Sequence, residues 1–171
     1  MKLTDLLPID KWIVFEKEIA LKSGLTAGVY DIHGVRITGY KAWANQLCPV
    51  VNNDKRGQTF ICAPAHQNLA SMAEQTREAV LEECDAGIAK LVVPIFVGDE
   101  FVGSAGGCGL CLETGEVEPF MVAKTLEMDE EAVEKLGKGI GVLSEEKAQE
   151  LIAFIQEKIE SIVAAYKAGP S

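Results

Sequence analysis

The sequence reads AKLVVPIFV from Ala89 to Val97, then GDE, then FVGSAGGC from Phe101 to Cys108. Two apolar runs separated by a short turn that contains glycine are typical of a β-hairpin. Because strands joined by a hairpin run antiparallel, this stretch predicts an antiparallel sheet rather than a parallel sheet with helical crossovers. Pro94 cannot donate to a strand ladder, so we expect an edge or a bulge there.

The segments on both sides of this hairpin supply the remaining elements of an α+β domain. Helices are predicted over 9–23, 65–76, 129–136 and 144–167, and strands over 27–32, 35–38 and 79–83. Between residues 40 and 60 the hydrophobic pattern loses its period, which predicts a long irregular connection. Long connections inside compact domains often carry function. A central antiparallel sheet flanked by helices, with a long C-terminal helix, is the simplest architecture for this order.

The last predicted helix has an apolar stripe with heptad spacing. Its positions are Ala148, Ile152, Ile155, Ile159, Ile162 and Tyr166. Such spacing is typical of a helix that packs along one seam, although Leu151, Phe154 and Val163 widen the stripe. We therefore expect a domain over residues 1–143, followed by an amphipathic helix over 144–171. This helix is expected to pack on the domain, on a dimer partner, or partly on each.

The composition excludes several classes of partner. The chain has 171 residues and a net charge of −10. Phosphate binding needs clustered Lys and Arg, so neither nucleic acid nor an anionic membrane surface is expected as a partner. The first residues contain no sustained apolar run, and no stretch approaches the roughly 20 apolar residues of a membrane span. We predict a soluble, cytoplasmic protein.

Several short motifs occur in an order that resembles a known family. They are Cys62 before a helix, CDAGI at 84–88, VPI at 93–95, GDE at 98–100, VG at 102–103 and GG at 106–107. Together they resemble the PocR ligand-binding sensory domain, over about residues 3–165. The resemblance implies a PAS-like fold that senses a small molecule, with simple hydrocarbon derivatives as the proposed ligands.

Two positions depart from the family pattern, and no output domain is expected. Asp85 lies where the family has His, and Cys108 lies near its Gln. Family members usually precede a DNA-binding or signalling domain, and this chain carries none. We therefore expect a standalone sensor whose signal leaves through a homodimer or a contact with a signalling protein.

The five cysteines form the second candidate site. They are Cys48, Cys62, Cys84, Cys108 and Cys111. The first three match cysteine positions of the family, and the last two form a Cys-x-x-Cys. One hypothesis is a zinc or iron–sulfur site made by Cys48, Cys62 and Cys84 with Cys108 or Cys111. The other is that some of them are buried thiols that pack like small aliphatic residues.

Strand geometry and the spacing of a nearby histidine help to weigh these alternatives. Alternation along a strand points Cys108 and Cys111 to opposite faces, which weakens the Cys-x-x-Cys as a metal pair. His66 follows Cys62 by four residues. It can share a helical face with that thiol, or it can simply be a partly exposed histidine.

The ligand-binding prediction combines the family positions with the irregular connection. The predicted pocket residues are Trp43, Cys48, Cys62, Cys84, Asp85, Gly107 and Cys108. Trp43 either walls the pocket or only plugs the sheet. Asp85 either accepts a hydrogen bond from a ligand or caps the turn at Ala86 and Gly87.

An enzyme is not expected. The two histidines do not support a Ser/His/Asp triad, and the paired glutamates lie at element ends. Asp85 raises the thiol pKa of neighbouring Cys84 by like-charge repulsion, which makes this thiol a poor nucleophile. The sequence therefore predicts a non-enzymatic small-molecule sensor. A metal-binding or redox-responsive regulator is the alternative.

Overall fold

A computed structural model describes residues 1–169, which form helices of very different lengths around one β-sheet. The elements are α1 (Leu3–Leu6), α2 (Ile9–Ser23), β1 (Thr26–Tyr30), α3 (Leu47–Asn53), α4 (Lys55–Gly57), the π-helix η1 (Gln58–Cys62), α5 (Ala63–Thr76), β2 (Val80–Glu83), β3 (Ala89–Val97), β4 (Glu100–Leu112), α6 (Pro119–Leu126), α7 (Glu130–Gly137), β5 (Val142–Leu143) and α8 (Glu145–Ala168). This is the predicted α+β, PAS-like fold with a long C-terminal helix.

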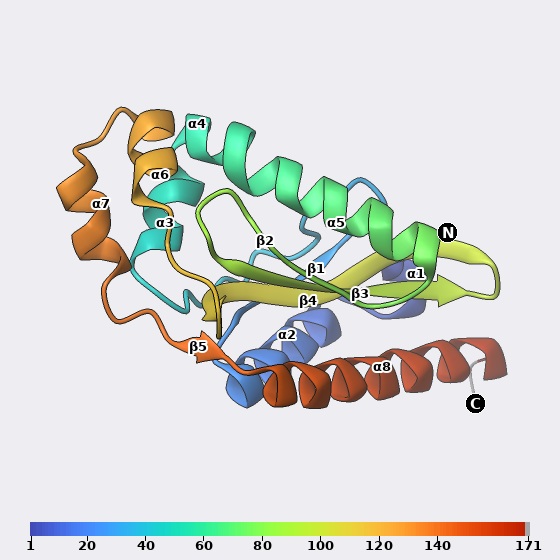
Figure 1. The fold of residues 1–171 in the computed structure, drawn as a ribbon. Helices are drawn as coiled ribbons and strands as arrows, with labels where there is room; N and C mark the ends of the chain where they lie inside the picture. Colours follow the sequence, from blue (N-terminus) through green and yellow to red (C-terminus); the bar gives the residue numbers. More distant parts are fainter. Residues whose placement is uncertain (170–171) are drawn as a thin grey trace.

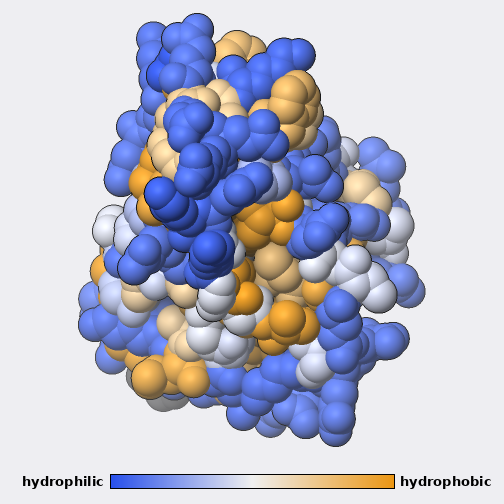
Figure 2. Space-filling view, turned by 60° about the vertical axis from the view of Figure 1, so that its left-hand side comes forward, coloured by the Kyte–Doolittle hydropathy of each residue, from blue (hydrophilic) through white to orange (hydrophobic). Residues whose placement is uncertain are grey.

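Three layers build the domain (Figure 1). The strand order is β1-β4-β3-β2, and each of these strands is antiparallel to its neighbours. Helix α5 covers one face of the sheet, while α2 and α8 lie on the other. Helices α3, α6 and α7 gather at one end, where they enclose a second apolar cluster. The surface at that end is largely hydrophilic, with hydrophobic residues exposed in a hollow at its middle (Figure 2).

The central hairpin confirms the prediction made from residues 89–108. Strands β3 and β4 pair from Val97 opposite Glu100 to Ala89 opposite Leu110. Strand β2 begins at Val80, opposite Val92, so residues of β3 after Val92 are not paired with β2. Pro94 lies in this part of β3, which is paired only with β4. A proline is tolerated there because it has no N–H to donate to a strand on the open side.

The face of the sheet toward α2 and α8 is packed with aliphatic side chains. Ala27, Val29, Leu91, Val93 and Ile95 are all at most 1% exposed and belong to one core cluster with residues of α1, α2 and α8. This packing is the main source of stability, because burying each large apolar side chain contributes about 1.5–3 kcal/mol.

The predicted irregular connection over residues 40–60 is wrong for its second half. Helices α3 and α4 and most of η1 lie there. The N-cap of α3 is Gln46, and the side chain of the preceding Asn45 accepts a hydrogen bond from the Cys48 N–H at 2.7 Å, which satisfies a free N–H of the first turn. Asn and Pro interrupt a periodic pattern in the sequence, but both are favoured at a helix start. Asn45 and Pro49 therefore mark a helix, not a loop.

Three further differences concern pairing and an overlooked helix. The predicted hairpin over 27–38 consists of β1 followed by a turn and a single bridge between Tyr30 and Arg36. Strand β5 adds to β4 in parallel, with Cys111 opposite Val142. Helix α6 was not predicted from the sequence. Eight residues with a proline at the start are too short for a clear helical period.

Helix α8 packs on its own sheet, which was one of the expected alternatives. Ser144 caps it by accepting a hydrogen bond from the Lys147 N–H at 3.1 Å. The buried positions are Ala148, Leu151, Ile155, Ile159 and Val163. Tyr166, at the end of the predicted seam, is exposed. Residues 170 and 171 of the expected unit 144–171 lie outside the described residues. Within residues 1–169, no helix combines the length and the apolar character needed to cross a membrane.

Candidate ligand-binding cavity

A cavity of about 400 Å³ lies between the sheet and the layer formed by α3, η1 and α5. Ligand sites in proteins have volumes of roughly 300–1,000 Å³ and mix apolar walls with a few polar groups. The apolar part of this wall includes Leu47, Val51, Ile61 and Ile88. Thiols, an imidazole, a phenol and three long cationic side chains supply much of the rest.

The floor of the cavity is a row of three residues on adjacent strands. Thr26 pairs with Cys108, and Cys108 pairs with Lys90, so all three side chains leave the sheet on the same face. Each of them lines the cavity. The Thr26 hydroxyl also accepts a hydrogen bond from the Ala44 N–H at 2.8 Å, which ties the segment before α3 to the sheet.

Glycines keep this face of the sheet low. Gly28 pairs with Gly106, two residues along each strand from the pair of Thr26 and Cys108 and on the same face of the sheet. A Cβ on Gly106 would lie 1.9 Å from the Leu91 carbonyl oxygen, so no side chain can replace it. A Cβ on Gly28 would meet the Tyr30 hydroxyl at 2.5 Å, because the phenol lies over this glycine. Neighbouring backbone and the Tyr30 ring therefore approach these glycines closely.

The roof includes a π-helical turn, Gln58–Cys62. Ile61 and Cys62 of this turn line the cavity. The extra residue of a π-helix changes the angle at which side chains leave the backbone, and such turns occur frequently at functional sites. Asn52 at the end of α3 donates a hydrogen bond to Gln58 at 2.6 Å, which joins α3 to the start of the turn.

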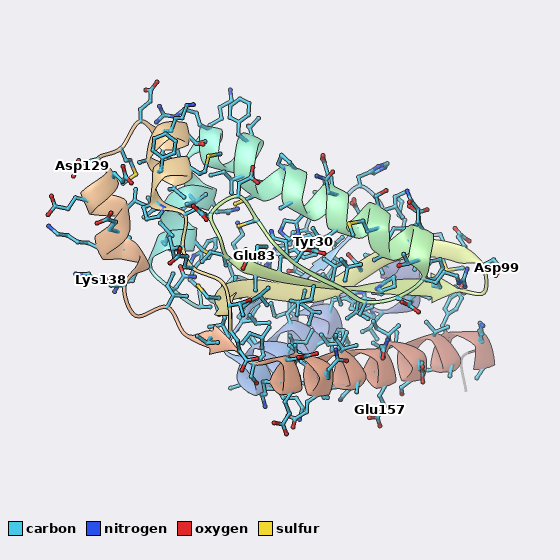
Figure 3. All side chains as sticks on the ribbon, in the orientation of Figure 1. Tyr30, Glu83, Asp99, Asp129, Lys138 and Glu157 are labelled. Carbon is cyan, nitrogen blue, oxygen red and sulfur yellow. The ribbon has the colours of Figure 1, made fainter. Side chains whose placement is uncertain are left out.

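Tyr30 and His66 meet across the cavity between β1 and α5. Their ring centroids are 4.2 Å apart, and Tyr30 lies in the layer between the sheet and α5 (Figure 3). Burial lowers the pKa of His66 well below its ordinary value, and the positive charges of Lys90 and Arg36 lower it further. Burial likewise raises the pKa of Tyr30. Both rings are therefore neutral at physiological pH.

Arg36 is held at the outer edge of β1 by a network that balances its charge. Its guanidinium donates to the Ala27 carbonyl at 2.6 Å and to the Tyr40 carbonyl, and it lies 3.4 Å from the carboxylate of Glu16. Glu16 is fully buried and also accepts hydrogen bonds from Thr38 and from the Val29 N–H. Burial raises the pKa of Glu16, while Thr38 and Arg36 oppose that rise.

Four of the five cysteines line the cavity: Cys48, Cys62, Cys84 and Cys108. Burial raises the pKa of the Cys48 thiol to about 12, and it also raises the pKa values of Cys62 and Cys84. In this structure these three thiols are therefore protonated at neutral pH. Within residues 1–169, no three His, Cys, Asp or Glu side chains are grouped so as to hold a metal ion.

The structure brings together five of the seven predicted ligand-binding residues. Trp43 and the four cysteines above line the cavity. Asp85 does not, because it is exposed in the turn between β2 and β3, which is closed by the Gly87 N–H on the Cys84 carbonyl at 2.8 Å. Gly107 faces the packed side of the sheet, where a Cβ would meet Leu25 at 2.9 Å.

Cys111 is the one predicted metal ligand that does not line the cavity. It is buried in the apolar cluster formed with α3, α6 and α7. Strand alternation predicted that Cys108 and Cys111 would separate, and they do. Gly109 between them has a φ of +115°, which only glycine adopts readily, and it lies beside a register shift in β4.

Sequence reasoning gave no role to several residues that line the cavity, among them Tyr30, Arg36 and Lys90. Lys90 could have been noticed, because it is the single charged residue in the otherwise apolar run from Ala89 to Val97. Tyr30 and Arg36 left none, because they fell within a predicted hairpin that does not form. His66, for which two interpretations stood open, is half-buried and lines the same cavity as Cys62.

Comparison with known proteins identifies the family. The chain matches the family model of the sensory domain found in PocR over residues 5–166. No curated protein and no solved structure matches it. The match covers nearly the whole chain, including every residue that lines the cavity. The chain therefore belongs to the family of the sensory domain found in PocR.

Proposed function

We propose that this protein is a non-enzymatic sensor that binds a small organic molecule in the cavity between the sheet and α3, η1 and α5. The observation that carries the proposal is the preformed cavity of about 400 Å³, with its mixed apolar and polar wall, in a member of a sensory-domain family. An engineered apolar cavity of roughly 150 Å³ accepts benzene, so this volume suits a molecule of comparable or moderately larger size.

The protonation states at the cavity support binding rather than catalysis. A nucleophilic cysteine needs a lowered pKa, whereas burial raises the pKa values of Cys48, Cys62 and Cys84. A general base at neutral pH needs a pKa near 7, whereas burial lowers that of His66 well below its ordinary value. These groups suit hydrogen bonding and packing against a ligand.

Signal output requires that the ligand favour one of two arrangements. The π-helical turn Gln58–Cys62 is suited to such a change because its register can shift by one residue. We expect ligand binding to move η1 and α5 relative to the sheet. The change would reach a second copy of the chain or a signalling protein, and α8 is one surface through which it could leave.

Thermal melting with a panel of small acids, amides, alcohols, aldehydes and amines tests the proposal. A ligand at 100 times its Kd adds about 2.7 kcal/mol, which for a domain of this size raises Tm by about 5–10 °C. Cys108→Phe fills the floor of the cavity and should abolish the shift. Cys111→Ala removes a thiol of the same strand outside the cavity and should keep it. Shifts that survive Cys108→Phe would place binding elsewhere.

A second candidate function is a metal- or redox-responsive regulator. The four thiols that share one cavity favour it. Metal analysis and absorbance spectra of protein purified without oxygen test this candidate. Stoichiometric zinc or iron that is lost in Cys48→Ser and Cys84→Ser would support it. Metal-free, colourless protein with an unchanged Tm after chelator treatment would reject it.

A further inference from the structure

Lys90 is a buried cation in the floor of the cavity. Its residue is only 3% exposed, and it lines the cavity beside Cys108. Within residues 1–169, its ammonium has neither a hydrogen-bond acceptor nor an ion-pair partner, and it is not fully enclosed by protein atoms, so it opens onto the cavity. Taking a lysine out of water without a partner is costly, and buried charges in proteins are normally paired.

The neighbouring groups do not compensate this charge. Glu82 is the residue opposite Lys90 on β2, but it is exposed and makes no ion pair with it. Within residues 1–169, no Asp or Glu side chain lines the cavity. Glu16, which lies beside Arg36, is already engaged by Arg36, Thr38 and the Val29 N–H.

The groups around Lys90 are neutral, so nothing at the site would repel an anion. Burial raises the pKa values of Cys62 and Cys84 and lowers that of His66, and the nearby positive charge of Lys90 is a smaller influence on all three. Burial nevertheless keeps the two thiols protonated. The imidazole is uncharged for the same reason.

We propose that the ligand is a small monocarboxylate whose carboxylate group binds the Lys90 ammonium. This inference rests on the proposed function and specifies its ligand class. One negative charge is expected because Lys90 is the buried cation of the cavity that lacks a partner. Arg36 is balanced by Glu16, and Lys41 is exposed and donates a hydrogen bond to the Asn52 side chain at 3.0 Å. An ammonium bound to a carboxylate in a desolvated site forms a short, charge-assisted hydrogen bond.

The rest of the wall defines the body of this ligand. Leu47, Val51, Ile61 and Ile88 provide apolar contacts. The Tyr30 ring and the thiols add polarisable surface. A short aliphatic or aromatic carbon skeleton with one carboxylate group matches both parts of the cavity.

The first experiment compares isosteres on the wild-type chain by calorimetry. The probes are butanoate, hexanoate, benzoate and phenylacetate, each with its amide and with the amine of the same carbon skeleton. At least one carboxylate should bind at least about tenfold more tightly than its amide, because only the carboxylate pairs with the cation. The amine should bind most weakly, since it adds a second positive charge beside Lys90.

Variants then assign the preference to Lys90. Lys90→Met should lower the affinity for the carboxylate at least about tenfold and leave that for the amide nearly unchanged. Lys90→Arg keeps the charge and should retain a preference for the carboxylate. Lys138→Met is the matched control, because Lys138 is exposed beyond α7 and its removal changes the net charge equally (Figure 3). The control should bind like the wild type.

The outcomes separate this inference from the proposed function. Neutral probes that bind as tightly as carboxylates, or a preference that persists in Lys90→Met, would overturn the monocarboxylate and leave the sensor in place. Tightest binding of the amine would do the same. Failure of every probe to bind the wild type, whatever its charge, would count against both. Should Lys90→Met fold poorly, Lys90→Gln and the wild-type comparison still decide the question.

Discussion

The two faces of the central sheet are built from alternate residues of the same strands, yet they differ in almost every physical respect. Toward α2 and α8, Ala27, Val29, Leu91 and Val93 form a dry aliphatic core. Toward α5, their neighbours in sequence include Thr26, Gly28 and Lys90, which leave a cavity of about 400 Å³. The comparison teaches that one face supplies the stability that lets the other keep a void, polar groups and a buried charge.

The largest effect is expected from a cavity made on the packed face. Leu91→Ala should lower the free energy of unfolding by about 2–5 kcal/mol, because Leu91 is 1% exposed and its side chain fills the core. Urea unfolding measures the change. Affinity for a cavity ligand should stay the same, since Leu91 faces away from it. A loss under about 1 kcal/mol would show that this face is less tightly packed than its contacts indicate.

The adjacent residue on the other face should respond in the opposite direction. Lys90→Met removes a buried charge without a partner and fills similar volume, so it should raise the free energy of unfolding by about 1–3 kcal/mol. The same urea experiment compares it directly with Leu91→Ala. Destabilisation by Lys90→Met would mean that the ammonium is well paired in the free protein, which would also weaken the monocarboxylate inference.

The third effect depends on pH and belongs to His66. Burial lowers the pKa of His66 below 6.5, so the unfolded chain takes up a proton first as the pH falls. The folded state is then destabilised below about pH 6.5, with a slope of at most about 1.4 kcal/mol per pH unit, until the folded pKa is reached.

Stability measured from pH 8 to pH 5 tests this effect. His66→Gln should lack the loss between pH 6.5 and pH 5 that the wild type shows. His33→Gln is the control, because His33 is exposed in the turn after β1, and it should follow the wild type. Equal slopes for the wild type and His66→Gln would contradict the burial of the imidazole.

The smallest expected effect is a difference in the reactivity of the Cys48 thiol. Raising the pKa of Cys48 from 9.0 to about 12 lowers its thiolate fraction at neutral pH about a thousandfold. Alkylation with iodoacetamide, followed by peptide mass spectrometry, should label Cys48 slowly in the folded protein and rapidly in urea. Fast labelling of the folded protein would show that this side of the cavity is wetter or more open than the structure indicates.

Local patterns allowed much of the fold to be predicted. The period of α2 and the apolar runs of β3 and β4 are strong signals, since a helix or strand of that length buries one stripe or face. Pro49 misled because proline breaks a helix in its interior but is tolerated in its first turn, where it lies in α3. The parallel pairing of β5 with β4 had no local signal, because two residues cannot carry a period.

The cavity was predicted in part. The cysteines were found because their positions match the family, and strand alternation separated Cys111 from Cys108. Asp85 and Gly107 were wrongly assigned to the pocket because each is adjacent in sequence to a cavity residue. Such neighbours point elsewhere: Asp85 into solvent and Gly107 toward the opposite face of the sheet. Lys90 was overlooked, since a lone lysine in a strand usually indicates an edge.

Residue type and spacing along the chain were enough to predict the longest helices, the antiparallel hairpin, the net negative charge and the family. Which thiols share a cavity, and which cations are paired, became known only from the folded chain. The physical reason is that burial and charge pairing depend on residues far apart in sequence. Lysine is usually a surface residue, and Lys90 is buried in the cavity because α5 and η1 cover this face of the sheet in the folded chain.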